Sequence, residues 1–401
     1  MTVRGRVSDY LRSIPPGRRF VFIIAFWALI FGTIIALDVL FLRSYIATNW
    51  APVEDINYYR YRTQGVLDGQ WLYRDIPCES PPLIVYLMIP AQLAGGGYLA
   101  YQVWFSFFSL LSALVLYWGL RLKNDYKAFL VALLFLIVPI GTIETTIGVQ
   151  DESIGVFLFL AAVVLAVTKR SRLSAMAVGV GAWTKLLNAL FYPVLFIKTC
   201  SWRERGVQLL IIGAVSLAVA LPYLIVCPTE FLAFPMYYFF GTGDNPAGGT
   251  SIWDFLSMGG INLPSYVFLA GIIIAYVIAL LVIWKKDLTL LQGTLLVMVV
   301  FIAFYSRIAV AYYMLPVALL LIWGVENKGI VWRCMLLYFP LVLSVPFSAS
   351  NIYQQPLIDV PYGWVIGLML TLAALVLFLD AARLAFKQMN FVDRASSWEG
   401  G

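Results

Sequence analysis

Apolar residues fill the chain in long runs that short polar segments separate, and the lengths of these runs predict the elements. A run of about 20 apolar residues can cross a membrane as a helix, whereas shorter runs are typical of re-entrant or interfacial segments. The pattern predicts an all-α polytopic membrane protein. We expect twelve crossings, near residues 20–42, 98–120, 127–143, 152–168, 172–184, 187–199, 207–227, 265–284, 288–305, 310–325, 331–347 and 362–384.

One shorter apolar run is not expected to cross. Residues 83–94 are followed by three glycines, and a crossing there would place the basic residues at 121–127 outside. We therefore expect an interfacial or re-entrant segment, and short interfacial helices in the long loop before it. The whole chain, residues 1–401, is expected to form a single transmembrane domain, in which the outer loops 43–97 and 228–264 cover the active site.

Charge supports this layout. The chain is 62% hydrophobic and 12% charged, whereas soluble domains have about 25% charged residues. With the N-terminus inside, 21 of the 27 Lys and Arg residues fall in cytoplasmic segments, as the positive-inside rule predicts. The net charge of +6 therefore reflects topology and does not indicate a nucleic-acid partner. Acids collect outside, at Glu54, Asp55, Asp68, Asp75, Glu79, Glu144, Asp151, Glu152, Glu230, Asp244, Asp254 and Asp359.

The residue types available restrict the chemistry. The chain has no His, the commonest general base and metal ligand, so a carboxylate is the expected base. Its four Cys residues have no metal-binding spacing and indicate no disulfide framework. We expect no cofactor and no metal site, although the outer acids are compatible with a divalent cation.

Adjacent carboxylates, Glu54 and Asp55, lie in the first outer loop. On a helix Asp55 shares a face with Tyr58, Tyr59 and Arg62. Such a carboxylate can take a proton from an acceptor hydroxyl, and partial burial would tune its pKa. The alternative is a solvated helix N-terminus whose acids interact with the helix dipole.

A second acidic group brackets a turn between two predicted spans. Glu144, Asp151 and Glu152 are suited to orienting sugar hydroxyls or to holding a divalent cation. The alternative is a hydrophilic turn in which Asp151 and Glu152 cap the following helix.

Lys185 and Arg307 are two of the six Lys and Arg residues that fall outside the predicted cytoplasmic segments, on the side where the acids collect. Arg307 precedes Tyr312 and Tyr313. Guanidinium and ammonium groups pair with phosphate, and phenols donate hydrogen bonds to it, so these four residues are candidate phosphate ligands. The alternatives are snorkelling to lipid headgroups or pairing with the acids opposite.

The first outer loop resembles that of the GT-C superfamily, multispanning glycosyltransferases that use polyprenyl-phosphate sugars. The acid pair is followed by Tyr58, Gly69, LYRD and PPL, and later by QDES, GAWTK and AYYMLP. The resemblance covers about residues 20–320 and is closest to the polyprenyl-phosphate-mannose branch that acts on phosphatidylinositol-mannosides and GPI anchors. The order Glu54-Asp55 differs from the Asp-Glu of the protein-mannosylating branch.

The resemblance implies inverting transfer of a hexose from a polyprenyl monophosphate to a hydroxyl of a lipid or glycolipid acceptor. Mannose is the first candidate for this hexose. Asp55 would be the base, with Glu54 second, and Lys185 and Arg307, with Tyr312 and Tyr313, would bind the phosphate. Sugar and acceptor would contact Tyr58, Arg62, Glu144, Asp151 and Glu152. The enzyme would lie in the plasma membrane, among membrane lipids, with its site on the extracytoplasmic side.

Other classes fit the sequence less well. A secondary transporter of a small polar or sugar substrate is the chief alternative, but its site would lie at mid-membrane, whereas the charges here crowd one interface. A flippase or polymer ligase would need a basic, Arg-rich outer face, and a structural membrane module leaves the outer acids without a role.

Overall fold

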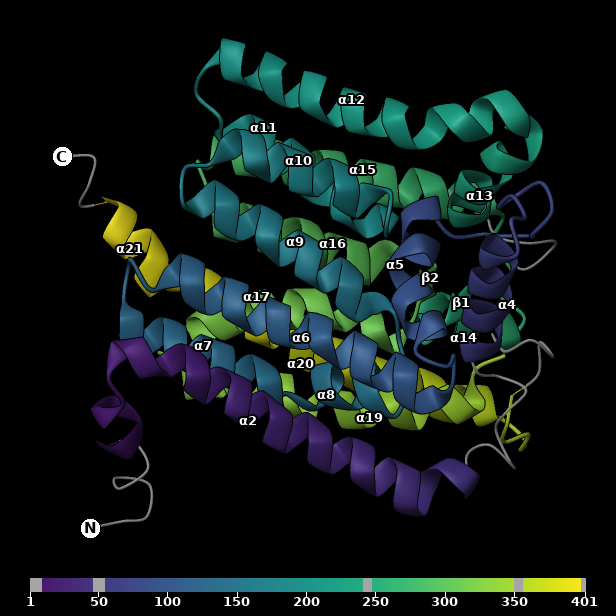
Figure 1. Ribbon diagram of the computed structural model, residues 1–401, viewed down its shortest axis with the longest axis horizontal. Coiled ribbons are helices and arrows are strands. Elements are labelled where there is room, and N and C mark those ends of the chain that lie inside the picture. The colour runs from purple at the N-terminus through teal and green to yellow at the C-terminus, as the bar shows by residue number, and fades with distance from the viewer. Residues whose placement is uncertain (1–8, 46–54, 241–246, 350–355, 398–401) are drawn as a thin grey trace.

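The computed structural model describes residues 9–45, 55–240, 247–349 and 356–397. Most of the described chain is helical, as the apolar pattern predicts (Figure 1). The long helices run between two ends of the molecule, and both termini lie at the same end. Glu54, one of the two carboxylates considered as the base, lies outside the described residues.

Six described stretches are long and apolar enough to cross a membrane. A bent pair, α7 (Asp125–Ile137) and α8 (Pro139–Thr146), makes a seventh if it counts as one span; its 47° bend lies where Pro139 holds the preceding residue extended. Three of the six are single helices, α6 (Tyr98–Leu120), α12 (Trp202–Val226) and α15 (Ser265–Lys285). The first stretch, Pro16–Tyr45, contains α2 (Pro16–Leu37) and the π-helix η1 (Asp38–Leu42). The last two are Lys328–Phe347, which contains α18 (Lys328–Leu336), α19 (Tyr338–Ser344) and η5 (Val345–Phe347), and Gly363–Ala395, which contains α20 (Gly363–Phe386) and most of α21 (Phe391–Ser397).

The prediction of twelve crossings is not confirmed. A helix of 17 residues is about 26 Å long, less than the hydrocarbon thickness of about 30 Å. Several predicted spans are this short or shorter, namely α9 (Glu152–Val167), α10 (Ser171–Ala182), η3 (Leu186–Leu190) with α11 (Phe191–Lys198), α16 (Leu290–Phe304), and η4 (Val310–Tyr313) with α17 (Met314–Gly324).

Burial explains why these short helices look like spans in the sequence. All residues of α17 are buried among other helices, whereas only 11% of the apolar windows of α2 and of α12 is buried. A helix that is apolar all round is either a core helix or a membrane span, so its composition alone does not separate the two. The run predicted not to cross forms α5 (Pro82–Leu93), which packs against α6 and against α4 (Ile56–Leu67).

A short parallel pair joins two segments that lie far apart in the sequence. The strand β1 (Gly248–Gly249) follows α13 (Pro228–Phe240), precedes α14 (Ile252–Met258), and pairs with β2 (Arg307–Ile308). Gly249 has φ +70°, and a Cβ there would lie 2.1 Å from the carbonyl oxygen of Ile308. Only glycine allows this approach, which fixes the second outer loop against the segment before α17.

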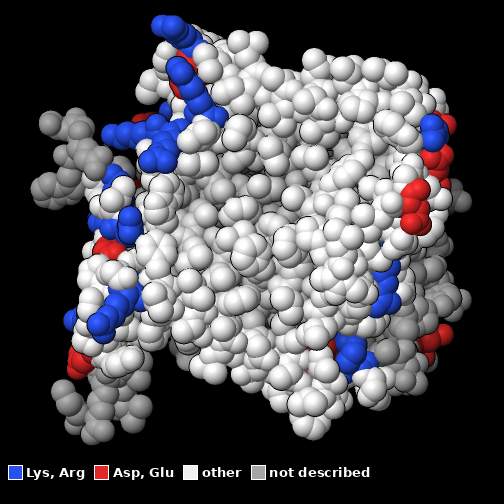
Figure 2. All heavy atoms as spheres, in the orientation of Figure 1, with Lys and Arg blue, Asp and Glu red and all other residues white. Residues whose placement is uncertain are grey.

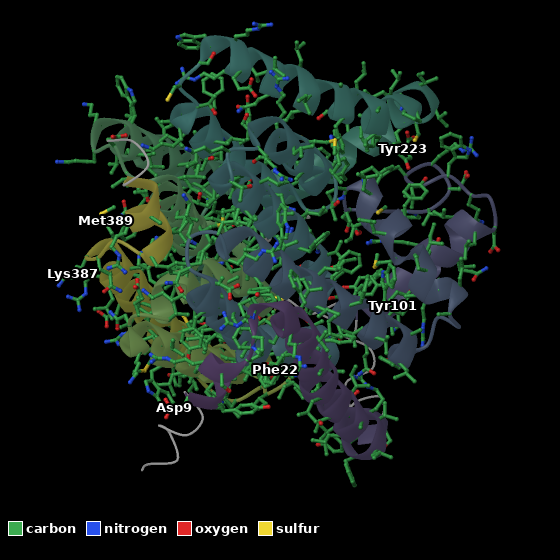
Figure 3. The ribbon with its side chains drawn as sticks, turned by 60° about the vertical axis from the view of Figure 1, so that its left-hand side comes forward. Asp9, Phe22, Tyr101, Tyr223, Lys387 and Met389 are labelled. Carbon is green, nitrogen blue, oxygen red and sulfur yellow. The ribbon has the colours of Figure 1, made fainter. Side chains whose placement is uncertain are left out.

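Charge separates the two ends. On the face drawn in Figure 2, most Lys and Arg side chains gather at the end that holds the termini in Figure 1. We call this the basic end, and the opposite end, with α4, α13 and α14, the acidic end. Figure 3 shows Asp9, Lys387 and Met389 at the basic end and Tyr101 and Tyr223 at the acidic end.

Candidate active site

The centre of the candidate site is Lys185, between α10 and η3. Its Nζ lies 2.7 Å from Asp151 Oδ1 and 2.8 Å from Glu152 Oε1, at the start of α9. All three side chains are almost entirely buried. Gly155, one turn along α9, makes room for the lysine, since a Cβ there would lie 3.0 Å from Lys185 Cγ. The charge of Lys185 is therefore neutralised by two carboxylates. Pairing with nearby acids was one of the alternatives that the sequence left open.

The acids of this group do not act as helix caps. Asp151 occupies the N-cap position of α9, yet its side chain makes no capping hydrogen bond and binds Lys185 instead. The capping interpretation of this acidic turn is therefore not supported.

Asp55 joins the group from the first outer loop. Its Oδ2 accepts a hydrogen bond of 3.0 Å from Gln150 Nε2, next to Asp151 in the chain. Asp55 stands at the N-cap of α4 without a side-chain capping bond. Its side chain keeps access to solvent, while the surrounding protein desolvates it and raises its pKa. The negative charge of Asp151 adds to this rise, whereas the Gln150 hydrogen bond and the charges of Lys185 and Arg62 oppose it.

The tyrosines of α4 are placed differently from the expectation. Tyr58 is exposed, and Arg62 lies over its ring at 5.3 Å. Tyr59 is buried instead, and its hydroxyl is hydrogen-bonded to the backbone of Asp151. Tyr59, rather than Tyr58, therefore connects α4 to the Lys185 group.

Arg62 acts mainly as a brace within the first outer loop. Its guanidinium forms an ion pair with Glu79 and lies 3.5 Å from Ser80 Oγ. It influences Asp55 through its charge. A direct role in binding sugar or acceptor would require it to share its pairing with Glu79.

Glu144 approaches the group from α8. Its Oε1 accepts a hydrogen bond of 2.9 Å from the hydroxyl of Tyr338 in α19, and its charge repels that of Asp55. The carbonyl of Glu144 also accepts a hydrogen bond from the backbone N–H of Gln150 at 2.9 Å. The turn after α8 thereby positions the amide that holds Asp55.

An apolar cavity of about 260 Å³ begins at Lys185 and Glu152. It lies between α9, η3, α15, α16 and η4, and most of its lining is aliphatic or aromatic. The residues with polar atoms in its lining are Glu152, Lys185, Asn188, Tyr305, Ser306 and Tyr312. The cavity thus combines apolar walls with a charged group.

The remaining candidate phosphate ligands lie in three different places. Tyr312 lines the cavity together with Lys185. Tyr313 is buried in the core and packs edge-on against Phe378 of α20, with ring centroids 5.5 Å apart. Successive residues in η4 face different sides, so the two tyrosines cannot both line the cavity. Arg307, in β2, interacts electrostatically with Asp254.

Asp254 is a buried carboxylate to which the sequence pattern assigned no role. It lies in the first turn of α14, whose N-cap Ser251 accepts a hydrogen bond from its backbone N–H at 3.1 Å. Ser348 Oγ donates to Asp254 Oδ2 at 3.0 Å. Burial raises the pKa of Asp254 to about 6, against the opposing charge of Arg307. The spacing Ser251-x-x-Asp254 is a helix-start signal, but nothing in it predicts full burial.

Asp38 is a second buried acid, and it lies inside the apolar run that was predicted as the first span. It begins the π-helix η1 within the first predicted span, pairs with Arg43 at 2.7 Å, and accepts a hydrogen bond of 2.6 Å from Gln102 Nε2. An acid inside an apolar run is itself a signal of a paired or functional group. Here it ties α2 to α6.

The part of the chain that the structure describes contains no group of side chains arranged to bind a metal ion. No three side chains of the His, Cys, Asp or Glu type come together there in a way that could hold an ion. The closest acids, Asp151 and Glu152, are bound to Lys185.

Comparison with known families adds one finding. The sequence model of glycosyltransferase family 87, which has a GT-C-type fold, matches residues 80–306, more than half of the 401 residues. The matched segment contains Glu144, Asp151, Glu152 and Lys185, while Asp55 and Arg307 lie outside it. No curated protein sequence matches the chain at a significant level.

Proposed function

Because the chain belongs to glycosyltransferase family 87, we propose that it transfers a hexose from a polyprenyl monophosphate to a hydroxyl of a lipid or glycolipid acceptor. Mannose is the first candidate for this hexose. One observation supports this above the others. The Lys185 group, within the electrostatic influence of Asp55, adjoins an apolar cavity. A lipid-linked sugar needs both an apolar channel and a charged reaction centre. Family membership favours transfer over secondary transport.

The donor would lie along the cavity. Its isoprenoid tail matches the walls formed by α15, α16 and η3, and its phosphate would lie where Lys185 and Tyr312 meet the lining. The positive charge of the Lys185 ammonium would attract the phosphate, because hydrogen bonds between ammonium and phosphate groups are charge-assisted. Arg307 follows Ser306, which lines the same cavity, and would add a second positive charge.

The sugar would lie beside Glu152. Glu152 Oε2 is buried and has no hydrogen-bond partner among the described residues, although the other oxygen binds Lys185. A buried acceptor atom of this kind costs free energy unless a donor reaches it. A sugar hydroxyl in the cavity would supply that donor.

Asp55 would act as the general base. It would take the proton of the acceptor hydroxyl as that oxygen attacks the anomeric carbon and the bond from this carbon to the phosphate oxygen breaks. The bonding electrons leave with polyprenyl phosphate, whose negative charge Lys185 and Arg307 would stabilise. One displacement inverts the anomeric centre. The raised pKa of Asp55 makes its carboxylate a stronger base toward the proton of the acceptor hydroxyl.

The orientation in the membrane follows from charge. Positive residues favour the cytoplasmic side, and both termini lie at the basic end (Figures 1 and 2). The acidic end, with Asp55, would therefore face the extracytoplasmic side of a plasma membrane. Glu54 remains a second candidate for the base.

A radiolabel experiment tests the proposal. Purified protein is incubated with short-chain polyprenyl-phosphate [¹⁴C]mannose and a membrane lipid extract, and the lipids are then separated. We expect label in a larger glycolipid, unchanged by EDTA. Label that stays on the donor with every acceptor would contradict the proposal. Accumulation of free sugar in proteoliposomes, without a new glycolipid, would favour the transporter.

A further inference from the structure

A polar depression, separate from the apolar cavity, lies on the side of α4 opposite the candidate active site. At 100° per residue, Asp55, Tyr59 and Arg62 occupy one side of the helix, and Arg60, Gln64 and Asp68 the other. The depression measures about 580 Å³ and lies between this second side and the segment after α5. We call it the outer groove. Its side chains are those of Arg60, Tyr61, Gln64, Asp68, Gln70 and Gln92.

A chain of hydrogen bonds rooted in the core fixes the amides of the groove. Thr63 and Tyr101 are fully buried, and their hydroxyls lie 3.0 Å apart. The Tyr101 hydroxyl donates to Gln92 Oε1 at 3.1 Å, and Gln92 Nε2 donates to Gln64 Oε1 at 3.0 Å. Gln64 Nε2 then donates to Asp68 Oδ1 at 2.8 Å. The orientation of each amide is therefore set before any ligand binds.

Gly96 lies close beside these amides. Gly96 has φ +63°, and a Cβ there would lie 2.6 Å from Gln92 Oε1. Arg60 Nε donates to the carbonyl of Gly96 at 2.5 Å. The backbone thus approaches Gln92 closely and is held in that position from α4.

The lining chemistry indicates an uncharged polyhydroxyl ligand. Carboxamides and a carboxylate, placed side by side, offer donors and acceptors that match neighbouring hydroxyls. Tyr61 is 54% exposed at the rim and presents an aromatic ring to the apolar face of a sugar. One cation, Arg60, and one anion, Asp68, balance each other. A phosphorylated headgroup would need more positive charge, and an acyl chain would need apolar walls.

We propose that the outer groove binds a sugar residue of the acceptor glycan, remote from the residue that receives the transferred hexose. The inference rests on the proposed function and specifies its acceptor. A helix with its side chains is about 10 Å thick, which is more than one sugar ring spans. An acceptor that reaches both Asp55 and the groove therefore carries an oligosaccharide.

Kinetics with two acceptors tests this. The Tyr61→Ala and Gln64→Ala variants are compared with the wild type on a lipid bearing one mannose and on a lipid bearing a mannose oligosaccharide. With the long acceptor we expect the KM to rise about tenfold, the equivalent of one lost hydrogen bond or ring contact, at unchanged kcat. With the short acceptor we expect no change. Equal effects on both acceptors, or none on either, would overturn the proposal.

A matched control and a binding measurement complete the test. Tyr266, an exposed tyrosine at the start of α15, is outside the groove, so Tyr266→Ala should behave as the wild type. Saturation-transfer NMR with mannotriose alone should show contact in the wild type and loss in Tyr61→Ala and in Asp68→Asn, an exposed substitution that leaves the buried Thr63–Tyr101 pair intact. Mannotriose contact without any sugar transfer would contradict the proposed function yet support the groove, whereas transfer without contact would overturn the groove alone.

Discussion

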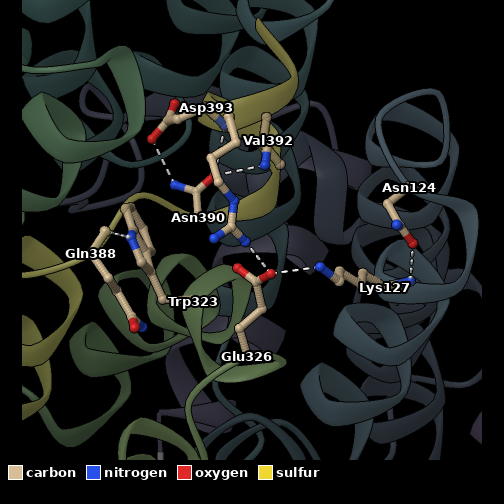
Figure 4. Close-up of polar contacts among 9 residues, drawn as sticks. Asn124, Lys127, Trp323, Glu326, Gln388, Asn390, Val392 and Asp393 are labelled. Carbon is tan, nitrogen blue, oxygen red and sulfur yellow. Dashed lines mark hydrogen bonds and ion pairs between the residues drawn. The ribbon is translucent and has the colours of Figure 1, made fainter. Parts of the chain in front are cut away.

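The ion-pair groups at the two ends of the molecule have opposite compositions. At the basic end one carboxylate, Glu326, pairs with two cations, Lys127 at 2.6 Å and Arg394 (Figure 4). The group ties α7, the turn after α17 and α21 together. Its cations remain partly exposed, Lys127 at 33% and Arg394 at 50%. Exposed pairs of this kind contribute about 1 kcal/mol or less.

At the acidic end one cation, Lys185, pairs with two carboxylates, Asp151 and Glu152, and all three side chains are at most 16% exposed. Removing one partner from a buried pair leaves an uncompensated charge and costs about 3–5 kcal/mol. The group also adjoins a cavity, which the Glu326 group does not line. Burial beside a cavity, and not the presence of an ion pair, therefore distinguishes a candidate site from an ion-pair group at the surface.

The largest expected effect follows from removing the buried cation. Lys185→Met would leave Asp151 and Glu152 repelling each other, so we expect a loss of about 3–5 kcal/mol in unfolding free energy and no measurable transfer. Thermal unfolding in detergent and the radiolabel assay measure the two effects. Lys185→Arg is the matched control and should restore stability in part. A Lys185→Met protein as stable as the wild type would remove the distinction between the two ends.

The next effect concerns catalysis without a change in stability. Asp55→Asn keeps the hydrogen-bonding oxygen toward Gln150 but cannot accept a proton, so kcat should fall by about 10²–10⁴-fold. Glu230→Gln, at an exposed acid in α13, should have no effect. Full activity of Asp55→Asn would transfer the role of base to Glu54 and leave the reaction class unchanged.

The pH dependence of kcat tests the environment that the structure gives Asp55 at the acidic end. A base works only when it is deprotonated, and desolvation by the surrounding protein raises the pKa of Asp55. Activity should therefore fall on acidification at a pH above the ordinary carboxyl value of about 3.9. A pH–rate profile of the wild type measures this midpoint. A midpoint at or below that value would contradict the assigned environment of Asp55.

A smaller effect is expected from Asp254 on the pH dependence of stability. Burial raises its pKa to about 6, above its value in the unfolded chain, so folding favours the protonated form. Its unfavourable contribution is absent at low pH and develops as the pH rises from about 4 to 6, reaching about 3 kcal/mol. Asp254→Asn should remove this dependence in a comparison of Tm values between pH 4 and pH 7. Parallel Tm curves for the two proteins would contradict the prediction.

The smallest effect belongs to the basic end. Glu326→Gln should lower the unfolding free energy by less than about 1 kcal/mol, leave transfer unchanged, and matter less at high salt. Unfolding at low and high ionic strength measures this. A loss as large as that of Lys185→Met would show that the two groups do not differ in energetic importance.

The sequence predicted the helical class and the identity of several charged residues, but not how they combine. The isolation of Lys185 among acids indicated that it needs an anion, and Asp151 and Glu152 provide it. The spacing on α4 put Tyr58 and Tyr59 on one face, and only packing buried Tyr59 and exposed Tyr58. Similarly, Tyr312 and Tyr313 were equivalent in sequence, yet one lines the cavity and the other packs on Phe378.

The number of crossings shows the same limit. Apolar composition describes α12 and α17 alike, although α12 is mostly exposed along its apolar window and α17 is entirely buried. Hydrophobicity measures exclusion from water, and both lipid and protein exclude water. Only the packing of neighbouring helices distinguishes a span from a core helix.

Apolar run length and charge bias are local properties of the chain, so the sequence was enough to predict a helical membrane protein with a basic and an acidic side. Only the folded chain shows that Asp55 contacts Gln150, that Lys185 pairs with Asp151 and Glu152 beside a cavity, and that Asp254 is buried. These contacts join segments distant in the chain, and no local pattern encodes which of them meet. The physical reason is that burial and charge pairing depend on what surrounds a side chain, which the fold alone supplies.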